Sequence, residues 1–169
     1  MAHKLTNRLL VGLYRVPWVK KRWVRRFQPL ESSSIPWTPV TKPLDKCKVA
    51  LLTTGGVHLR TDSPFNMDDK DGDPSYRKIP STATPDQLTI THDYYDHRDA
   101  DRDINLVFPI DILRKCQQEG LLGKSADFFY SFMGHIDGPH LKTLLDRTAK
   151  EVAVEMKEGG VEVAILVPA

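Results

Sequence analysis

The fold is decided by the stretch Cys47-Lys-Val-Ala-Leu-Leu-Thr-Thr-Gly-Gly-Val-His58. Its apolar centre, Val49 to Leu52, is short and continuous, which is typical of a strand buried on both faces in a parallel sheet. Gly55 and Gly56 follow it, and glycine lets the backbone turn sharply where a strand ends. The stretch lacks the GxGxxG and P-loop patterns, so it favours a strand-to-loop turn over a phosphate cradle.

Strand and helix patterns alternate along the rest of the chain. Further strands are predicted at 88–92, 127–133 and 161–167, and helices at 110–117 and 141–156. This order predicts an α/β domain with a mostly parallel sheet and flanking helices, a Rossmann-like or flavodoxin-like half. Residues 60–81, rich in Asp, Pro and Gly, are predicted to form a loop on the surface or over an active site.

The amino-terminal region differs in composition from the rest. Residues 4–27 are basic and aromatic, with leucines and tryptophans at helical spacing, and a linker rich in Ser and Pro follows. We therefore expect residues 1–34 to form a basic amphipathic arm and linker, and residues 35–169 to form the α/β domain. Such an arm can also lie on a membrane or bind RNA, but a clamp on the domain or on a partner subunit is the favoured interpretation.

Composition favours an ordinary cytoplasmic protein. A length of 169 residues is enough for one compact domain, and a net charge of +2 with 27% charged residues gives no reason to expect nucleic acid as a partner. The sequence has no apolar run of about 18 residues that would span a membrane, and no secretory signal. Its two cysteines, Cys47 and Cys116, do not form a CxxC pair, which favours a reducing compartment.

Ionisable side chains gather directly after the predicted strands. The densest cluster, 91–103, contains His92, His97, two tyrosines and several aspartates. Further histidines follow the other predicted strands: His58, His135 and His140. Because the carboxyl ends of parallel strands lie on one edge of a sheet, where ligands of α/β proteins bind, we expect these side chains to converge on a site.

Several interpretations of this cluster remain open. Its histidines and aspartates could hold a divalent metal in a metal-dependent enzyme, although no HxH or HExxH pattern occurs. The histidines could instead hydrogen-bond loop backbones, in a non-catalytic binding module. The third interpretation is an acid–base lining that orients a substrate, but it lacks a nucleophile. Its groups would be His92 or His97, poised by Asp93 or Asp96, with Tyr94 as a donor.

A family resemblance rests on six segments in a fixed order. They are TTGGVH (53–58), GDPSYR (72–77), THDYYDHRDAD (91–101), VFPID (107–111), YSFMGHI (130–136) and VAILVPA (163–169). Together they resemble the selenoprotein B subunit of the bacterial glycine, sarcosine, betaine and D-proline reductases, from about Ile35 onward. The arm with its IPWT linker is more similar to the branch of related oxidoreductases than to glycine reductase itself.

The resemblance implies that the reactive atom lies beyond Ala169. In the family, the strand similar to 161–167 is followed by a redox-active selenocysteine or cysteine and by another α/β half. We therefore expect the chain to be the amino-terminal part of such an oxidoreductase, incomplete at its carboxyl end and truncated where an in-frame UGA is read as a stop. A domain fragment or a short pseudogene product is the plainer alternative.

The resemblance also implies a reaction and partners. The reaction would be reductive cleavage of a carbon–nitrogen or similar bond in a small amino-acid-like substrate, with electrons from a thiol or selenol donor protein. In the true reductases a partner subunit carries a pyruvoyl group that binds the substrate amine. This sequence supplies no such group, so a partner subunit is expected, and no cofactor or metal is expected in the chain itself.

The same reasoning gives the expected site residues. The catalytic groups are expected to be His92, His97 and Tyr94. The substrate-binding residues are expected to be Thr54, Gly55, Gly56, His58, Asp73, Tyr76, Arg77, Asp93, Asp96 and His135.

Overall fold

The computed structural model describes residues 13, 16–25 and 36–169. Most of the predicted amino-terminal arm lies outside these residues. Its described part includes helix α2, Pro17–Val24, which begins at a proline, a residue suited to the first position of a helix. The division of the chain at residue 34 stays a prediction.

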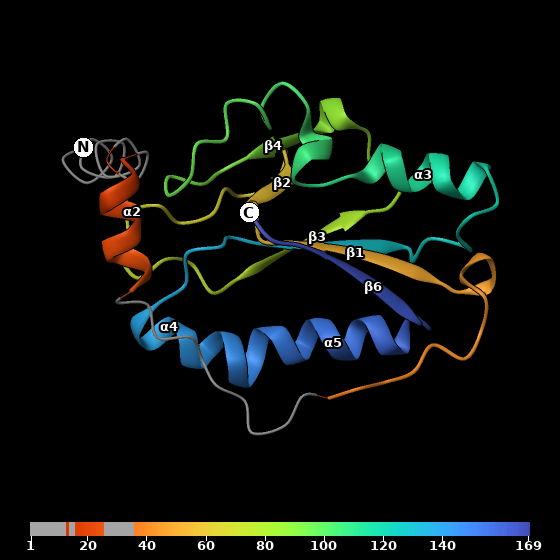
Figure 1. Cartoon of the computed structure of the whole chain (residues 1–169). Helices are drawn as coiled ribbons and strands as arrows, with labels where there is room; N and C mark the ends of the chain where they lie inside the picture. The colour runs from red at the N-terminus through yellow and green to blue at the C-terminus, as the bar shows by residue number, and fades with distance from the viewer. Residues whose placement is uncertain (1–12, 14–15, 26–35) are drawn as a thin grey trace.

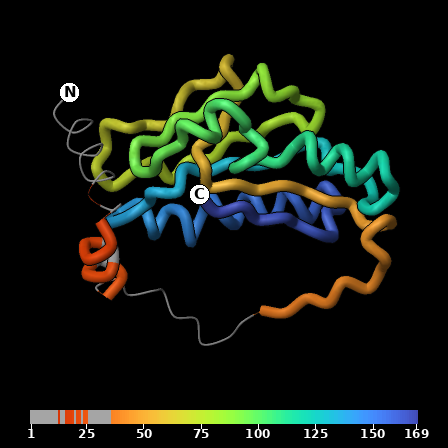
Figure 2. The backbone as a smooth tube through the Cα atoms, turned by 45° about the horizontal axis from the view of Figure 1, so that its top comes forward, coloured from red at the N-terminus to blue at the C-terminus, as the bar shows by residue number. Residues whose placement is uncertain are grey.

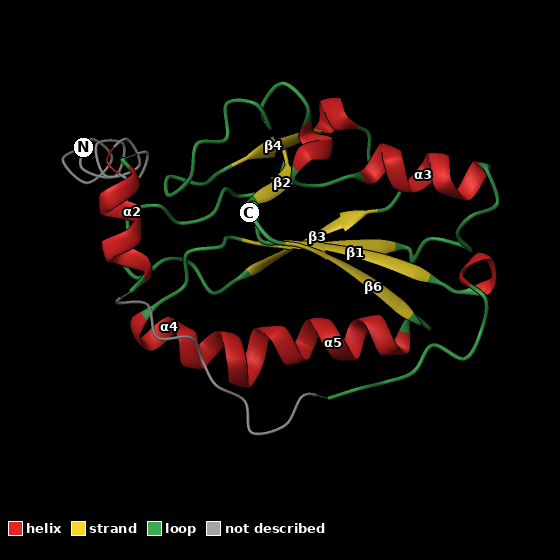
Figure 3. Cartoon of the chain, in the orientation of Figure 1, coloured by secondary structure: helices red, strands yellow, loops and turns green. Residues whose placement is uncertain are grey.

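A four-stranded sheet forms the centre of the molecule, in the order β3-β5-β1-β6 (Figures 1 and 3). Strands β1 (Val49–Thr53), β5 (Phe128–Phe132) and β6 (Val163–Val167) are parallel, and β3 (Tyr76–Pro80) joins β5 as an antiparallel edge. Three of the four predicted strands are therefore present in this sheet. The prediction of an α/β fold with a mostly parallel sheet is confirmed.

Helices cover both faces of the sheet, as Figure 1 shows. Helix α3 (Ile110–Gln118) lies on one face, and on the other lies a continuous helical segment made of α4 (Gly138–Thr143), the π-helical turn η4 (Leu144–Thr148) and α5 (Ala149–Glu158). Short 3₁₀ turns occupy Leu44–Lys46, Pro85–Gln87 and Ile104–Leu106. No described helix is long and apolar enough to cross a membrane.

Two hydrophobic clusters explain why these elements pack in layers. The larger cluster joins the sheet to α3 through fully buried side chains such as Leu51, Phe108 and Ile110. The smaller cluster joins it to α5 through Tyr130, Phe132 and Val152. Burying both faces of the sheet in this way is what the continuous apolar strands require.

Two regions differ from the sequence-based expectation. The predicted strand at 88–92 is only β4 (Leu88–Ile90), and it pairs antiparallel with β2 (Val57–Leu59) in a separate two-stranded sheet. Leu88, Ile90 and His92 alternate with Thr89 and Thr91, a pattern that indicates a half-buried strand but carries no information about the partner strand. The second region is the predicted loop 60–81, which contains β3, the edge strand of the main sheet. Ile79 of this strand is fully buried. Pro80 lies at the strand end, where the missing N–H of proline is tolerated.

Gly56 fixes the turn that leaves β1. Its φ of 69° lies in the left-handed region, and a Cβ added there would come within 2.5 Å of the Thr91 carbonyl oxygen. The Gly56 N–H donates to the Phe132 carbonyl (2.9 Å), and its own carbonyl accepts from the Thr91 N–H (2.9 Å). One residue thus connects the ends of β1 and β5 to the segment that follows β4.

We predict that Gly56→Ala lowers the free energy of unfolding by about 3 kcal/mol or more, because left-handed strain of about 1–2 kcal/mol adds to a backbone clash. Urea unfolding measures the change. The matched control is Gly120→Ala, which has a similar φ of 72° but nothing within 4 Å of the added Cβ. The control should lose about 1 kcal/mol, and equal losses in both variants would contradict the role of the clash.

Candidate functional site

The strand order places a topological switch point between β1 and β6. The chain crosses from β1 to β5 on one side of β1 and returns from β5 to β6 on its other side. Such a reversal leaves the carboxyl ends of β1 and β6 free to receive a ligand, which is the usual binding position in open α/β sheets. The strand order therefore favours a ligand site beside Thr54 and the residues that follow Val167.

The carboxyl end of β6 is held directly beside the turn after β1, as Figure 2 shows. The Thr54 N–H donates to the Val167 carbonyl (3.1 Å), and the Ala169 N–H donates to Thr54 Oγ1 (3.0 Å). Gly134, after β5, lies so close that a Cβ there would meet the carbonyl oxygens of Thr54 (3.0 Å) and Ala169 (3.1 Å). Three strand ends thus converge at one point.

His92 lies against this point with only 5% of its surface exposed. Its Nε2 faces the Gly134 N–H (3.2 Å), and its Nδ1 faces the Tyr94 N–H (3.1 Å). A neutral imidazole has one acceptor nitrogen, so it can accept from one of these two N–H groups, and a second ring proton would remove that acceptor. Burial, together with the nearby His97 and His135, lowers the pKa of His92 to about 4.

A neutral His92 limits the chemistry that it can perform. With a pKa of about 4, the imidazole carries no charge at neutral pH and is a poor general acid. It can accept a hydrogen bond and fix the position of the Gly134 turn. The geometry therefore favours a role in orientation over one in proton donation.

Aromatic rings surround His92. The Tyr95 ring lies at 4.6 Å from it, and the Tyr95 hydroxyl donates to the Gly55 carbonyl (3.0 Å). Burial and the nearby Asp101 raise the pKa of Tyr95 to about 12, so its hydroxyl stays protonated. Tyr95 was not among the expected site residues, although its place beside Tyr94 in the cluster was the available signal.

Tyr94 and His135 form a second pair beside His92. Their rings stack at 3.8 Å with an interplanar angle of 20°, and His135 Nε2 contacts the Lys70 carbonyl (3.0 Å). The structure thus brings together three of the residues expected from the sequence, from the loops after β4 and β5. Their rings make an aromatic wall next to the end of β6.

Asp93 has a carboxylate oxygen without a partner. Its Oδ2 is buried and accepts no hydrogen bond within the described residues. An unpaired buried carboxylate oxygen is costly. Among the described residues, this buried oxygen therefore still lacks a hydrogen-bond donor.

The rest of the histidine and aspartate cluster is more exposed. His97 Nδ1 pairs with Asp101 (2.9 Å), and Asp96 makes a bidentate pair with Arg98, both contacts at 2.7 Å. The His97 ring makes an edge contact with the Tyr95 ring at 5.5 Å. These two expected residues lie on the outer rim.

Several other expected site residues make hydrogen bonds and ring contacts within the fold. Both ring nitrogens of His58 are engaged, with the Leu59 carbonyl (2.7 Å) and with Thr91 Oγ1 (2.8 Å). Arg77 stands over the Phe65 ring at 4.2 Å and donates to backbone carbonyls of the preceding loop. Asp73 accepts from Ser75 and Asn66, and Tyr76 donates to Glu155 of α5 (3.1 Å). The segment 60–81 is thus held by polar groups of its own and by the contact of Tyr76 with α5.

The glycine turn offers no free backbone N–H group for an anion. The N–H of Gly55 donates to Thr53 Oγ1 (2.9 Å), and the N–H groups of Thr54 and Gly56 are used by β6 and β5. This agrees with the plain turn predicted from the sequence. Any contribution of these three residues to a ligand has to come through other atoms.

The described residues at this edge include no thiol and no group of side chains arranged as metal ligands. No group of three or more His, Cys, Asp or Glu side chains among the described residues is arranged to hold a metal ion. Cys47 is buried before β1, at the opposite end of the strand, and Cys116 lies on α3. The metalloenzyme alternative therefore gains no support from the described geometry.

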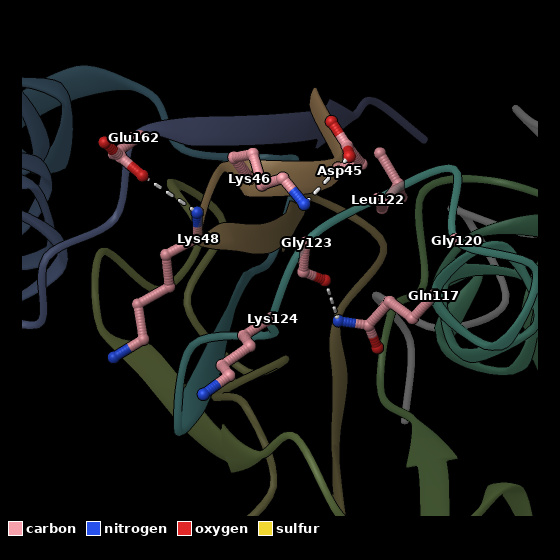
Figure 4. Close-up of a pocket in the computed structure, with 9 residues that line it drawn as sticks. All are labelled: Asp45, Lys46, Lys48, Gln117, Gly120, Leu122, Gly123, Lys124 and Glu162. Carbon is pink, nitrogen blue, oxygen red and sulfur yellow. Dashed lines mark hydrogen bonds and ion pairs between the residues drawn. The ribbon is translucent and has the colours of Figure 1, made fainter. Parts of the chain in front are cut away.

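A pocket of about 630 Å³ lies at the opposite edge of the sheet (Figure 4). It is lined by Lys46, Lys48, Lys124, Glu162 and residues between α3 and β5. Lys48 Nζ donates to the Gly159 carbonyl at the end of α5 (2.9 Å), and Lys46 pairs with Asp45 (3.3 Å). None of the expected site residues reaches this pocket.

Comparison with known proteins identifies the family of this chain. A family model described as glycine/sarcosine/betaine reductase selenoprotein B matches residues 22–169. The chain belongs to this family. The family likeness expected from the six sequence segments is therefore confirmed.

Individual relatives are subunits of reductase complexes. The chain is 40% identical over 130 residues to D-proline reductase subunit gamma of Acetoanaerobium sticklandii, a match that covers 77% of this chain and 52% of the relative. It is 30% identical to glycine reductase complex component B subunit gamma of Carboxydothermus hydrogenoformans, covering 78% and 30%. It is 32% identical to betaine reductase complex component B subunit beta of Peptoclostridium acidaminophilum, covering 74% and 28%.

The chain thus spans about a third to a half of the length of these curated relatives. No solved structure matches the chain at a significant level.

The pKa of His92 gives a testable pH dependence. Because the pKa is about 4 in the folded protein and about 6.5 when unfolded, the unfolded chain binds the extra proton first. The stabilisation is fully present above about pH 6.5 and is lost as the pH falls toward 4. We predict a loss of about 3 kcal/mol from this residue over that range.

Urea unfolding of the wild type and of His92→Gln, between pH 4 and pH 7.5, measures this effect. The variant, which has no titrating ring, should show a flatter dependence by up to one proton per molecule. His140→Gln is the control, because His140 pairs with Asp69 on the surface (2.9 Å). An unchanged slope in His92→Gln would contradict the buried neutral state.

Proposed function

We propose that this chain forms the amino-terminal α/β part of a selenoprotein B-type oxidoreductase that reductively cleaves a small amino-acid-like substrate in the cytoplasm. The substrate would lie at the carboxyl edge of the sheet, between β1 and β6. A selenol or thiol directly beyond Ala169 would act there. A partner subunit would carry the pyruvoyl group, and a thiol or selenol protein would supply electrons.

The observation that carries this proposal is the position of Ala169. Its N–H donates to Thr54 Oγ1, and its carbonyl lies beside Gly134, which His92 holds. A residue following Ala169 would begin at the point where the three strand ends meet. Gly134 favours close approach there, because any side chain at this position would meet two carbonyl oxygens.

The described residues suit such a reaction in three ways. The aromatic wall of Tyr94 and His135, with Tyr95 behind it, would exclude water on one side of the substrate. Neutral His92 would hold the Gly134 turn in place without adding a charge. The free Oδ2 of Asp93 would accept a hydrogen bond from a substrate amine or ammonium group.

The chemistry balances with a dithiol or selenol–thiol donor. When a carbon–nitrogen bond is cleaved reductively, the carbon and the nitrogen each gain one hydrogen, and the two electrons come from two chalcogen atoms that end as a disulfide or selenenylsulfide. The residues of this chain would bind and orient the substrate for that step. They would not supply the electrons, because Cys47 and Cys116 lie elsewhere in the fold.

The nucleotide sequence after the codon for Ala169 tests the origin of the selenol. We expect UGA followed by an open frame that encodes further α/β sequence. Mass spectrometry of the protein from its native host should then find a chain longer than 169 residues that contains selenium. A UAA or UAG codon at this position would overturn this part of the proposal.

Asp93→Asn tests the substrate position. We expect the variant to bind D-proline at least about tenfold more weakly, because a charge-assisted hydrogen bond is worth about 1.5–3 kcal/mol. Calorimetry with the assembled enzyme measures the dissociation constant without turnover. Asp99→Asn is the control, since this carboxylate is 83% exposed and pairs with Arg102 at 3.3 Å. Equal binding by both variants and the wild type would count against the assignment.

A further inference from the structure

The outer edge of β6 has no strand beside it in the described structure. The sheet order ends at β6, which pairs only with β1 over the register Val49↔Val163 to Thr53↔Val167. The other edge strand of the sheet, β3, runs antiparallel to β5 and ends at Pro80. The two edges therefore differ, because only β6 presents an uninterrupted apolar strand in the parallel direction.

The backbone N–H and C=O groups of alternate residues of β6 point toward this open edge. The Val163 N–H donates to the Lys48 carbonyl (3.2 Å), and the Val167 carbonyl accepts from the Thr54 N–H (3.1 Å). Both residues therefore direct their backbone groups at β1. Because the direction alternates along a strand, the N–H and C=O groups of Ala164 and Leu166 face away from β1.

Side-chain exposure marks the same edge. Leu166 is 66% exposed although it stands opposite Leu52 in the centre of the sheet. Val163, Ile165 and Val167 pack on the larger cluster but remain only half-buried. A short strand of sequence VAILV with an open edge is an efficient template for pairing, and the strands of parallel sheets are normally buried on both faces.

The lengths of the relatives indicate what covers this edge. The match covers 52% of D-proline reductase subunit gamma and 30% of glycine reductase component B subunit gamma, so these proteins carry a large additional part. The order β5-β1-β6 corresponds to the first three strands of a flavodoxin-like sheet, 2-1-3-4-5. In that order the next strand adds beside β6.

We propose that the outer edge of β6 is a docking surface for a parallel apolar β-strand from the part of the reductase fold that the relatives carry outside the matched region. The strand would pair with the backbone of Ala164 and Leu166 and bury the Leu166 side chain. This inference goes beyond the proposed function, because it concerns the edge of the sheet and holds for any chemistry at the His92 site.

Co-expression tests the proposal. The 169-residue chain is produced together with a second polypeptide, made of the part of D-proline reductase subunit gamma that lies outside the region matched here. We expect a 1:1 complex by size-exclusion chromatography with light scattering. Hydrogen exchange at the Ala164 and Leu166 amides should be at least tenfold slower in the complex than in the chain alone.

Leu166→Lys should weaken the complex at least tenfold, because it places a charge in the pairing surface. The matched control is Leu121→Lys, since Leu121 is a leucine of similar exposure (59%) that lies in the turn after α3 and not on β6. Circular dichroism and the unfolding midpoint check that both variants fold. Neither variant touches the site residues, so this result is independent of D-proline binding.

Three results would overturn the proposal. They are the absence of a complex with the folded wild-type chain, equal binding by Leu166→Lys and the control, and a homodimer of the chain that Leu166→Lys disrupts. The last result would assign the edge to a second copy.

Discussion

The backbone that leaves β1 is the constraint on which the rest of the structure depends. Between Thr54 and Gly56, every N–H donates within the protein: to β6, to Thr53 Oγ1 and to the end of β5. The Gly56 carbonyl then accepts from Thr91, the residue before His92. A three-residue turn thus sets the relative positions of two strands and the aromatic loop, and a glycine with positive φ is the condition for it.

The buried state of His92 follows from that constraint. With Thr91 fixed on Gly56, the next side chain has to enter the space between the loop and the Gly134 turn, where it meets two backbone N–H groups. Burial then keeps the imidazole neutral. In this fold His92 is therefore a rigid spacer with one acceptor nitrogen, while His97 with Asp101 and the Asp96–Arg98 pair lie on the rim.

Local apolar patterns predicted the elements whose environment is decided by burial alone. These are β1, β5 and β6, together with the helices ended near Gly120 and Gly159. Strand pairing was not predictable for β3 and β4, because their partners are chosen by long-range contacts. The same limit applies to the site. Tyr94 and His135 could be expected to lie close together because the ends of their strands converge. The hydrogen bonds of His58 and Arg77 to backbone carbonyls could not be predicted, because a pattern of side chains does not show where backbone carbonyls lie.

The π-helical turn between α4 and α5 sets the geometry of the segment that follows His135. The Ala149 N–H reaches back five residues to the Leu144 carbonyl, so the turn holds one residue more than a regular helix needs. One residue corresponds to a rotation of about 100° about the helix axis. The extra residue therefore acts as a phase shift: it lets α5 face the sheet through Val152 while α4 keeps His140 on Asp69 of the long loop.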